Sequence, residues 1–241
     1  MGIVDKLIKR FLHQGIIVSK AKISASAYRI QISSESIKSV DFTPGHFLRL
    51  GVGIDNKDAS LKDKVRSYSV WNIDKINGIM DLAIATHSNG IGAKWVENCT
   101  VGMKVSFTWK TGKFIQDNSS DSYLMIGDLS ALSHLYIINR HLPKEKQVES
   151  VLYNESVEEL YEDIDGATPF SFYQMASNPV DKIKQKIAEI LPSMHGTKMI
   201  YIAGDSRLCI ALSQHLRNEL NWNTKQLKIK PFWNPAKKGL E

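Results

Sequence analysis

The hydrophobic pattern of this chain changes its period once, and that change constrains the fold more than any other feature. Across residues 16–114, apolar residues fall in short runs separated by turn signals at Pro44-Gly45, Asn77-Gly78 and Gly102. Short strands at regular spacing, punctuated in this way, are typical of an antiparallel barrel. We therefore expect a β-barrel domain over residues 1–117, with strands at 16–25, 28–33, 46–52, 65–72, 79–85 and 104–109.

Beyond a polar, serine-rich linker at residues 116–122, runs of strand and helix pattern alternate. Such alternation predicts a parallel sheet with helices on both faces. We expect an α/β domain over residues 118–241, with strands at 123–126, 151–154 and 199–203 and helices at 130–141, 179–191 and 207–220.

Length and composition fit a two-domain globular protein. The chain has 241 residues, of which 43% are hydrophobic, and only two cysteines, Cys99 and Cys209. Two isolated cysteines are too few for a disulfide framework, a zinc site or an iron–sulfur cluster, so we expect no metal centre. The sequence shows no bilayer-length apolar stretch and no signal peptide. We expect a cytoplasmic monomer without stable membrane insertion.

An amphipathic helix is predicted over residues 3–12, and we expect it to dock on the body of the protein rather than touch a membrane. The net charge of +6 raises the possibility of nucleic-acid binding, but the chain has no zinc finger, no RNP-like strand and no base-reading basic helix. We therefore expect no nucleic-acid partner. Lysines at 225, 228, 230, 237 and 238 form either a solvated face or an attractor for an anionic small molecule.

Four residues in one predicted strand, Arg66-Ser67-Tyr68-Ser69, combine three useful chemical groups. We expect the guanidinium, the ring and a hydroxyl to project from one face, because side chains in a strand repeat every two residues. Arginine grips phosphate, tyrosine stacks on a flat ring system and serine hydrogen-bonds a ring nitrogen. The pattern fits a flavin, and the alternative is a surface strand with a half-buried tyrosine.

The loop at residues 86–95 strengthens the flavin hypothesis. Gly90 and Gly92 allow close backbone approach, while the turn amides and the hydroxyls of Thr86 and Ser88 suit a pyrophosphate. Glycines serving a simple turn are the alternative. Together with Arg66 and Tyr68, this loop predicts a flavin dinucleotide, FAD.

Two predicted strands of the second half end in the same pair, Gly127-Asp128 and Gly204-Asp205, each ahead of a helix. Ligands of open α/β sheets bind at such carboxyl ends, where helix N-termini offer amides to phosphates. A nucleotide-binding domain is therefore predicted, although it has no GxGxxG loop. Gly51-Val52-Gly53 lies in the barrel half and is not interpreted as such a loop.

Several segments, in the same order, resemble the siderophore-interacting protein family of the ferredoxin-reductase-like superfamily, from about residue 16 to the C-terminus. In the barrel half these are residues 44–50, the family's RxYT/S pattern at Arg66, Tyr68 and Ser69, and its H-x-x-G and tryptophan at His87, Gly90 and Trp95. In the second half they are residues 124–132, similar to the family's "GDETAL" segment, residues 203–205, similar to its "AGE" turn, and Phe232, Trp233 and Gly239, similar to its "YWxxG".

This resemblance implies an enzyme that uses FAD to reduce siderophore-bound iron(III) and release iron(II), with NADPH, NADH or a protein such as a ferredoxin as electron donor. No protein acid or base is expected to be catalytic. Two alternatives are a flavin reductase that passes electrons to a separate redox protein, and a siderophore or flavin carrier without turnover.

The chain departs from the family in three places. Trp71 stands where a second arginine usually follows the flavin pattern, and Asp205 replaces the glutamate of the "AGE" turn. The predicted helix at residues 3–12 has no counterpart that we can match.

Two side chains, Lys198 and Arg207, are candidate cations that could bind the ribose 2′-phosphate of the nicotinamide cofactor. The other predicted site residues form three groups. For FAD they are Arg66, Ser67, Tyr68, Ser69, Thr86, His87, Ser88, Gly90, Gly92, Ala93 and Trp95. For the nicotinamide side they are Gly127, Asp128, Ser130, Gly204, Asp205 and Trp233. For the ferric siderophore they are Lys110, Lys113, Lys230, Lys237 and Lys238.

Overall fold

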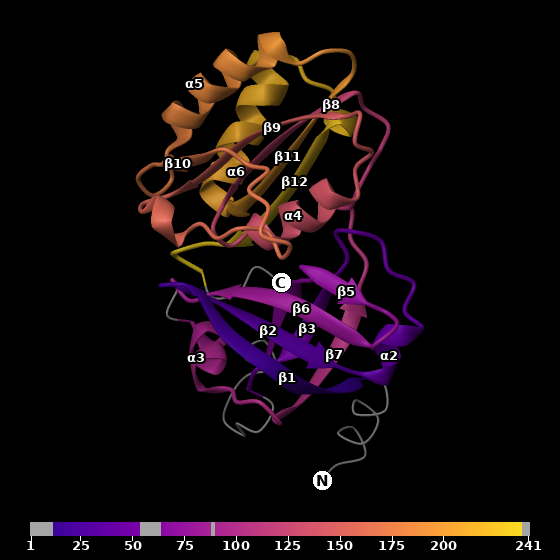
Figure 1. Ribbon diagram of the computed structural model, residues 1–241. Coiled ribbons are helices and arrows are strands. Elements are labelled where there is room, and N and C mark those ends of the chain that lie inside the picture. The colour runs from indigo at the N-terminus through magenta and orange to yellow at the C-terminus, as the bar shows by residue number, and fades with distance from the viewer. Residues whose placement is uncertain (1–11, 54–63, 88–89, 238–241) are drawn as a thin grey trace. The chain divides into compact units, whose positions relative to one another are not determined.

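The computed structural model describes residues 12–53, 64–87 and 90–237, and the chain divides into two compact units between Gly112 and Lys113 (Figure 1). The predicted helix at residues 3–12 falls almost wholly outside the described residues. So do two predicted site residues, Ser88 and Lys238. Within the described ranges, no helix is both long enough and apolar enough to cross a membrane.

The first unit is an antiparallel sheet in which every pair of neighbouring strands runs in opposite directions. Its strand order is β4-β3-β7-β1-β2-β6-β5, and β4 also contacts β6, so the sheet curls into a barrel. The elements are β1 (His13–Ser24), β2 (Ala27–Ser33), α2 (Glu35–Lys38), β3 (Phe47–Gly51), β4 (Val65–Ser69), β5 (Asn72–Asp74), β6 (Ile79–Ala85), α3 (Ile91–Asn98) and β7 (Lys104–Lys110).

Alternation along the strands builds the core of this unit. Ile30 and Ile32 on β2, and Leu48 and Leu50 on β3, are completely buried, whereas the residues between them are partly exposed. This period of two is what a strand with one face toward the core requires. Gly78 has a φ of +67° at the predicted Asn77-Gly78 turn, a conformation that glycine adopts at little cost.

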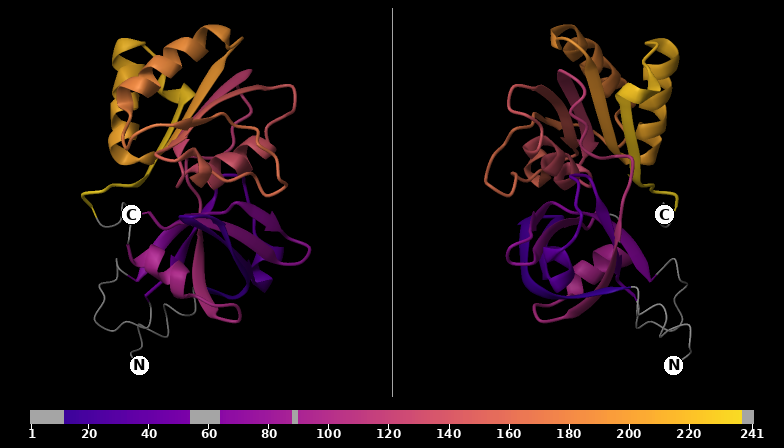
Figure 2. Two further views of the ribbon diagram at one scale, coloured as in Figure 1. Left: turned by 60° about the vertical axis from the view of Figure 1, so that its left-hand side comes forward. Right: turned by 90° about the vertical axis from the view of Figure 1, so that its right-hand side faces the viewer.

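The second unit is a parallel sheet with strand order β10-β9-β8-β11-β12. The views in Figure 2 show the helices that follow β10 and β11, coloured orange to yellow, on one face of this sheet. Its strands are β8 (Ser122–Asp128), β9 (Gln147–Asn154), β10 (Phe172–Gln174), β11 (Lys198–Asp205) and β12 (Leu227–Trp233). Its helices are α4 (Leu132–Arg140), α5 (Val180–Ile190) and α6 (Ser206–Gln214), with short turns of helix at Val157–Glu159, Leu191–Ser193, His215–Glu219 and Thr224–Gln226.

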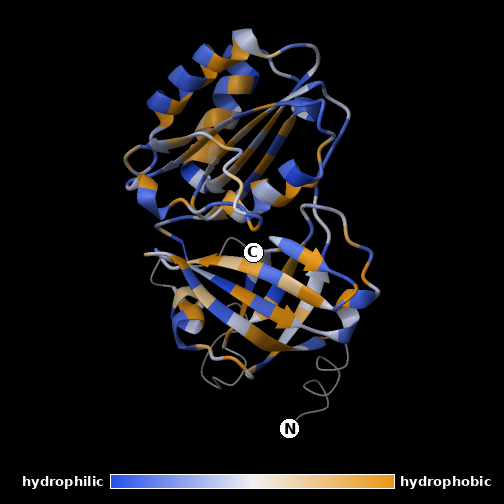
Figure 3. Cartoon of the chain, in the orientation of Figure 1, coloured by the Kyte–Doolittle hydropathy of each residue, from blue (hydrophilic) through white to orange (hydrophobic). Residues whose placement is uncertain are grey.

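Both faces of the parallel sheet are covered, and each strand divides its side chains between them. Ile126 and Ile202 pack in one core with residues of α5 and α6. Tyr123 and Tyr201 lie on the opposite face, where Tyr201 meets Phe114 edge to face. All seven residues of β8 are buried, so the central strands read as continuous apolar runs, as the orange strands of Figure 3 show.

The predicted fold class, an antiparallel barrel followed by an α/β parallel-sheet domain, is confirmed. Three details of the prediction are wrong. The single strand expected over residues 65–72 breaks at Val70 and Trp71, which are buried, and β4 and β5 lie at opposite ends of the strand order. Strands β10 and β12 were not predicted, because both are edge strands with an incomplete apolar pattern.

Candidate functional site

Arg66 and Tyr68 lie on β4, an edge strand of the first unit. Arg66 is directly opposite Leu50 and Tyr68 is opposite Leu48, so both share the face of those buried leucines. Ser69 is opposite Phe47 and points to the other face. The prediction that the hydroxyl shares the face of Arg66 and Tyr68 is therefore wrong for Ser67 and Ser69, because each stands an odd number of residues from them.

Helix α3 packs directly against Arg66 and Tyr68, through Gly92. A Cβ atom at Gly92 would lie 2.2 Å from Tyr68 Oη and 3.6 Å from Arg66 Cγ. Only a residue without a side chain allows this approach. The structure therefore brings the loop at residues 86–95 onto the Arg66-Tyr68 face of β4, and this contact is the candidate site of the first unit.

The start of α3 supplies a set of main-chain donors to this place. Its N-cap is Gly90, which has no side chain to accept from the amides of the first turn. The positive end of a helix and a guanidinium both favour a negatively charged group. Arg66 Nη1 donates to the carbonyl of Val65 at 2.7 Å, which restrains the guanidinium. Together they form a cradle that fits the pyrophosphate and ring of FAD.

The remaining residues predicted for FAD divide into contact and support positions. The Thr86 amide donates to the Ser26 carbonyl at 2.7 Å, which fixes the end of β6 before the loop, and His87 is exposed beside it. Ala93 and Trp95 are only 4% and 8% exposed. Buried side chains on α3 hold the helix against the barrel, so we assign these two a positioning role.

Trp71, at the position of the family's second arginine, is a packing residue. It is 3% exposed, and the Arg29 guanidinium lies 5.9 Å from its ring centroid. Arg29 Nε also donates to Asp81 Oδ1 at 2.7 Å, and the Trp71 amide donates to the Asp81 carbonyl at 2.8 Å. The indole therefore supplies no phosphate contact at this position.

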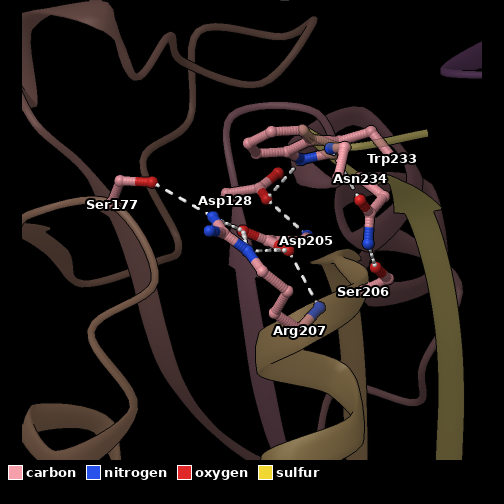
Figure 4. Close-up of polar contacts among 8 residues, drawn as sticks. Asp128, Ser177, Asp205, Ser206, Arg207, Trp233 and Asn234 are labelled. Atoms are coloured by element: carbon pink, nitrogen blue, oxygen red, sulfur yellow. Dashed lines mark hydrogen bonds and ion pairs between the residues drawn. The ribbon is translucent and has the colours of Figure 1, made fainter. Parts of the chain in front are cut away.

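The candidate site of the second unit lies at the carboxyl edge of the parallel sheet, around Asp128 (Figure 4). One oxygen of its carboxylate accepts from the amide and hydroxyl of Ser130, at 2.9 and 2.5 Å. The other accepts from the Asp205 amide and from Trp233 Nε1, both at 2.8 Å. A single carboxylate thus joins the ends of β8, β11 and β12.

Gly204 is required beside this carboxylate. Its φ is +118°, and a Cβ there would lie 2.3 Å from Asp128 Oδ2. The next residue, Asp205, is 1% exposed and caps α6 by accepting from the Arg207 amide at 2.9 Å. The structure therefore brings together all six residues predicted for the nicotinamide side, at the edge where parallel sheets bind ligands.

The predicted lysines have different surroundings. Lys110 ends β7 opposite Phe47, whose other neighbour across the sheet is Ser69. Lys230 packs over the Phe232 ring, and burial lowers the pKa of its amine to about 8. Lys113 and Lys237 are both exposed. A neighbour of Lys230, Lys228, is already paired with Asp117 at 2.9 Å.

The two candidate cations for a 2′-phosphate are also separated by the structure. Lys198 begins β11, seven residues before Asp205, so it lies about 23 Å from the ligand edge, and its amine donates to the Leu191 carbonyl at 2.8 Å. The assignment of Lys198 is therefore wrong. Arg207 lies at the correct edge and contacts Ser177, which was not predicted because β10 was not. The polar Ser177-Asn178 pair just before α5 was a helix-start signal that pointed to it.

Two family models match the chain. "Oxidoreductase FAD-binding domain" matches residues 14–115, and "Siderophore-interacting protein" matches residues 120–236. The second half of the chain therefore matches the siderophore-interacting protein family, and the first half matches an FAD-binding oxidoreductase domain. These matches confirm the predicted resemblance, and with the NADH-dependent relative described below they support FAD and a pyridine nucleotide as cofactors.

Solved structures share the fold across nearly the whole chain. The siderophore-interacting protein from Acinetobacter baumannii is 16% identical with a TM-score of 0.77, covering 94% of this chain and 92% of that one. Phthalate dioxygenase reductase is 15% identical with a TM-score of 0.72, covering 93% of this chain and 69% of that one. A curated relative, NADH-cytochrome b5 reductase 1 from Pyricularia oryzae, is 26% identical over 151 residues. That match spans 59% of this chain and about half, 48%, of the relative.

The Arg66→Ala variant should bind FAD about ten- to a hundredfold more weakly, because a hydrogen bond to a charged group contributes about 1.5–3 kcal/mol. Titration of the apoprotein with FAD, followed by flavin fluorescence, measures the change. Lys104→Ala, at an exposed position on β7, is the control and should bind like the parent. Parental affinity in Arg66→Ala would remove Arg66 from the site.

The Gly92→Ala variant should lose FAD because the new Cβ displaces the Tyr68 hydroxyl. Tyr68→Phe removes that hydroxyl and leaves Cζ at 3.4 Å, an ordinary contact, while keeping a stacking ring. The double variant should therefore retain more FAD than Gly92→Ala alone, as measured by the flavin content of purified protein. If the single and double variants lose equal amounts of FAD, the clash between the new Cβ and the Tyr68 hydroxyl is not the cause of the loss.

The Gly204→Ala variant should slow bleaching of the flavin by a nicotinamide cofactor at least tenfold while leaving the flavin absorbance spectrum intact. The physical reason is the clash with Asp128 together with a strained backbone. Gly166→Ala has a similar positive φ, +80°, with no atom closer than 4.0 Å, and controls for strain alone. Loss of FAD from Gly204→Ala would show that the two units do not divide the cofactors in this way.

Proposed function

We propose that this chain is a ferric-siderophore reductase that uses FAD and takes electrons from NADPH or NADH. The observation that carries the proposal is the siderophore-interacting family match over residues 120–236, joined to a barrel whose Arg66, Tyr68 and Gly92 form a flavin cradle. The oxidoreductase chemistry itself is supported by the FAD-binding domain match over residues 14–115.

The reaction follows from how siderophores hold their metal. They bind iron(III) through hard oxygen donors, which hold iron(II) far more weakly, so one-electron reduction releases the metal. A nicotinamide cofactor gives two electrons as a hydride, and bound FAD links such a donor to one-electron acceptors. The balance is one NADPH or NADH and two iron(III) giving the oxidised nicotinamide, one proton and two iron(II).

The chain's own residues hold the reactants in this proposal. Arg66 and the first amides of α3 bind the FAD phosphates, and Tyr68 packs on the ring. The four-donor network of Asp128 keeps the strand ends in place at the nicotinamide edge. No side chain transfers a proton in the rate-limiting step.

The ferric siderophore is proposed to bind by charge. Lys110 lies two strands from Ser69, about 10 Å away by strand spacing, on the face of Ser69 and thus opposite to that of Arg66 and Tyr68. Lys113, Lys230, Lys237 and Lys238 are the other proposed contacts. Lys230 loses its charge as the pH rises through about 8, so its contribution is confined to lower pH. Exposed charges contribute about 0.2–1 kcal/mol per pair, so affinity is modest and depends on salt.

A second candidate is a reductase that delivers electrons to a separate redox protein. Its support is the fold shared with phthalate dioxygenase reductase, described as a structure for electron transfer from pyridine nucleotides to [2Fe–2S], and the match to NADH-cytochrome b5 reductase 1. In that case the basic side chains would form a protein docking surface. A carrier without turnover is the third possibility.

Anaerobic stopped-flow absorbance tests the proposal. NADPH or NADH should bleach the flavin, and a ferric siderophore should restore its absorbance while an iron(II) chelator develops colour. Absence of bleaching would favour a carrier. Faster reoxidation by a ferredoxin or cytochrome b5 than by any ferric siderophore would favour the second candidate.

The same experiment addresses the basic contacts through Lys110→Ala. With an anionic ferric siderophore, reoxidation should slow as salt is added, and it should slow further in Lys110→Ala than in Lys104→Ala. Lys104 is the matched control because it begins the same strand that Lys110 ends. A rate that is independent of salt in all three proteins would exclude binding by charge.

A further inference from the structure

The segment that carries α3 is attached to the β1–β2 hairpin at both of its ends. At its start, the Thr86 amide donates to the carbonyl of Ser26, in the turn between β1 and β2, at 2.7 Å. At its end, Nζ of Lys20 on β1 donates to the carbonyls of Glu97 and Cys99, at 2.8 and 2.9 Å. The hairpin therefore holds this segment before and after the part that contacts Tyr68.

Lys20 reaches the end of α3 because of its place on the strand. It is directly opposite Ile30, which is fully buried, so its side chain leaves β1 on the face that turns toward the core. Its amine also lies 5.2 Å from the centroid of the Tyr28 ring. An amine that points away from bulk water needs acceptors, and the two carbonyls of α3 supply them.

The end of α3 needs a partner of this kind. The last carbonyls of a helix have no amide to accept from within the helix, and a cation near them is favourable because the helix dipole is negative there. The last turn of α3 contains no basic residue of its own. Lys20, which lies more than seventy residues earlier in the chain, supplies the missing positive charge.

Lys20 acts on the flavin cradle through the helix and not by direct contact. The helix has eight residues and is therefore about 12 Å long. The Lys20 amine lies at one end of it, and Gly92, in contact with Tyr68 and Arg66, lies near the other. Because a Cβ at Gly92 would be only 2.2 Å from Tyr68 Oη, the helix has little freedom to move toward β4. A helix released at its far end would draw its first amides away from Arg66.

We propose that Lys20 is a positioning residue for FAD, which holds α3 so that its first amides and Arg66 face the same phosphate group. This inference rests on the FAD cradle of the proposed function and adds a residue outside the cradle that sets its affinity. Molecules in which α3 is displaced do not bind FAD, so the apparent affinity falls with the fraction of molecules in which α3 is in place.

Titration of the apoprotein with FAD, followed by flavin fluorescence, tests this role. Lys20→Met keeps an apolar stem and removes the amine, and it should bind FAD about five- to fiftyfold more weakly, the effect of losing hydrogen bonds from one charged donor. Lys20→Arg retains a positive donor and should recover most of the parental affinity. Lys22→Met is the matched control, because Lys22 is an exposed lysine on the same face of β1, and it should bind like the parent. Parental affinity in Lys20→Met would overturn the proposal.

The same titration at high salt separates positioning from long-range attraction. At about 1 M salt the Debye length is about 3 Å, so a lysine about 12 Å from the phosphate no longer attracts it through the solvent. The weaker binding of Lys20→Met should persist under these conditions, because its cause is the position of α3. A difference from the parent that disappears at high salt would show attraction by charge and overturn the positioning role.

Hydrogen exchange of the apoprotein separates positioning from a general loss of stability. In Lys20→Met the amides of α3 should exchange faster than in the parent, while those of β2 and β3 should exchange at the parental rate. Lys20→Arg should restore slow exchange in α3. Faster exchange throughout the barrel, or parental exchange in α3, would contradict the proposal.

The two proposals fail separately. If Arg66→Ala loses FAD and Lys20→Met does not, the cradle stands and only the role of Lys20 is wrong. If the Lys20 variants behave as expected but no ferric siderophore reoxidises the flavin, the positioning role stands and ferric-siderophore reduction is wrong.

Discussion

The edge of the parallel sheet where we propose that the nicotinamide cofactor binds depends on the hydrogen bonding of one carboxylate, that of Asp128. Asp128 is 6% exposed, and a buried carboxylate is costly unless donors satisfy it. Its four donors come from the loop after β8, from β11 and from β12, so the ends of these three strands are fixed relative to one another by the protein alone. This arrangement needs Gly204, because any side chain there would occupy the position of the carboxylate.

The flavin cradle in the other unit is built by the same physical means. At Gly92 the missing side chain lets α3 approach Tyr68 and Arg66, just as at Gly204 it lets a strand end approach Asp128. In both places a helix begins beside the glycine, but at α6 the Asp205 and Arg207 amides already donate to the carboxylates of Asp128 and Asp205, whereas the Gly90 cap of α3 has no side chain to accept from its first amides. Close approach of backbone to a functional group is therefore the common requirement of the two candidate sites.

Much of the fold was predictable because burial imposes a period on the sequence. In strands with one buried face, buried and partly exposed residues alternate, and strands covered on both faces consist of continuous apolar residues. These two patterns made the two units recognisable. The edge strands β10 and β12 were missed because they bury less, and β12 carries lysines at alternate positions. The break between β4 and β5 was missed because Val70 and Trp71 continue the apolar pattern while the chain changes partners.

The sequence by itself determined the fold class, the resemblance to the family and the edge of each unit where chemistry is expected, since Gly-Asp pairs after strands and the Arg66-Tyr68 pair are local signals. The structure was needed to exclude Lys198, which the sequence had left as a candidate cation. Only the tertiary structure decided that α3 packs on Tyr68, that Asp128 is occupied by four donors, and that Arg207 meets Ser177. The physical reason is that these contacts join residues far apart in the chain, and their distances are set by strand pairing and helix packing rather than by local sequence.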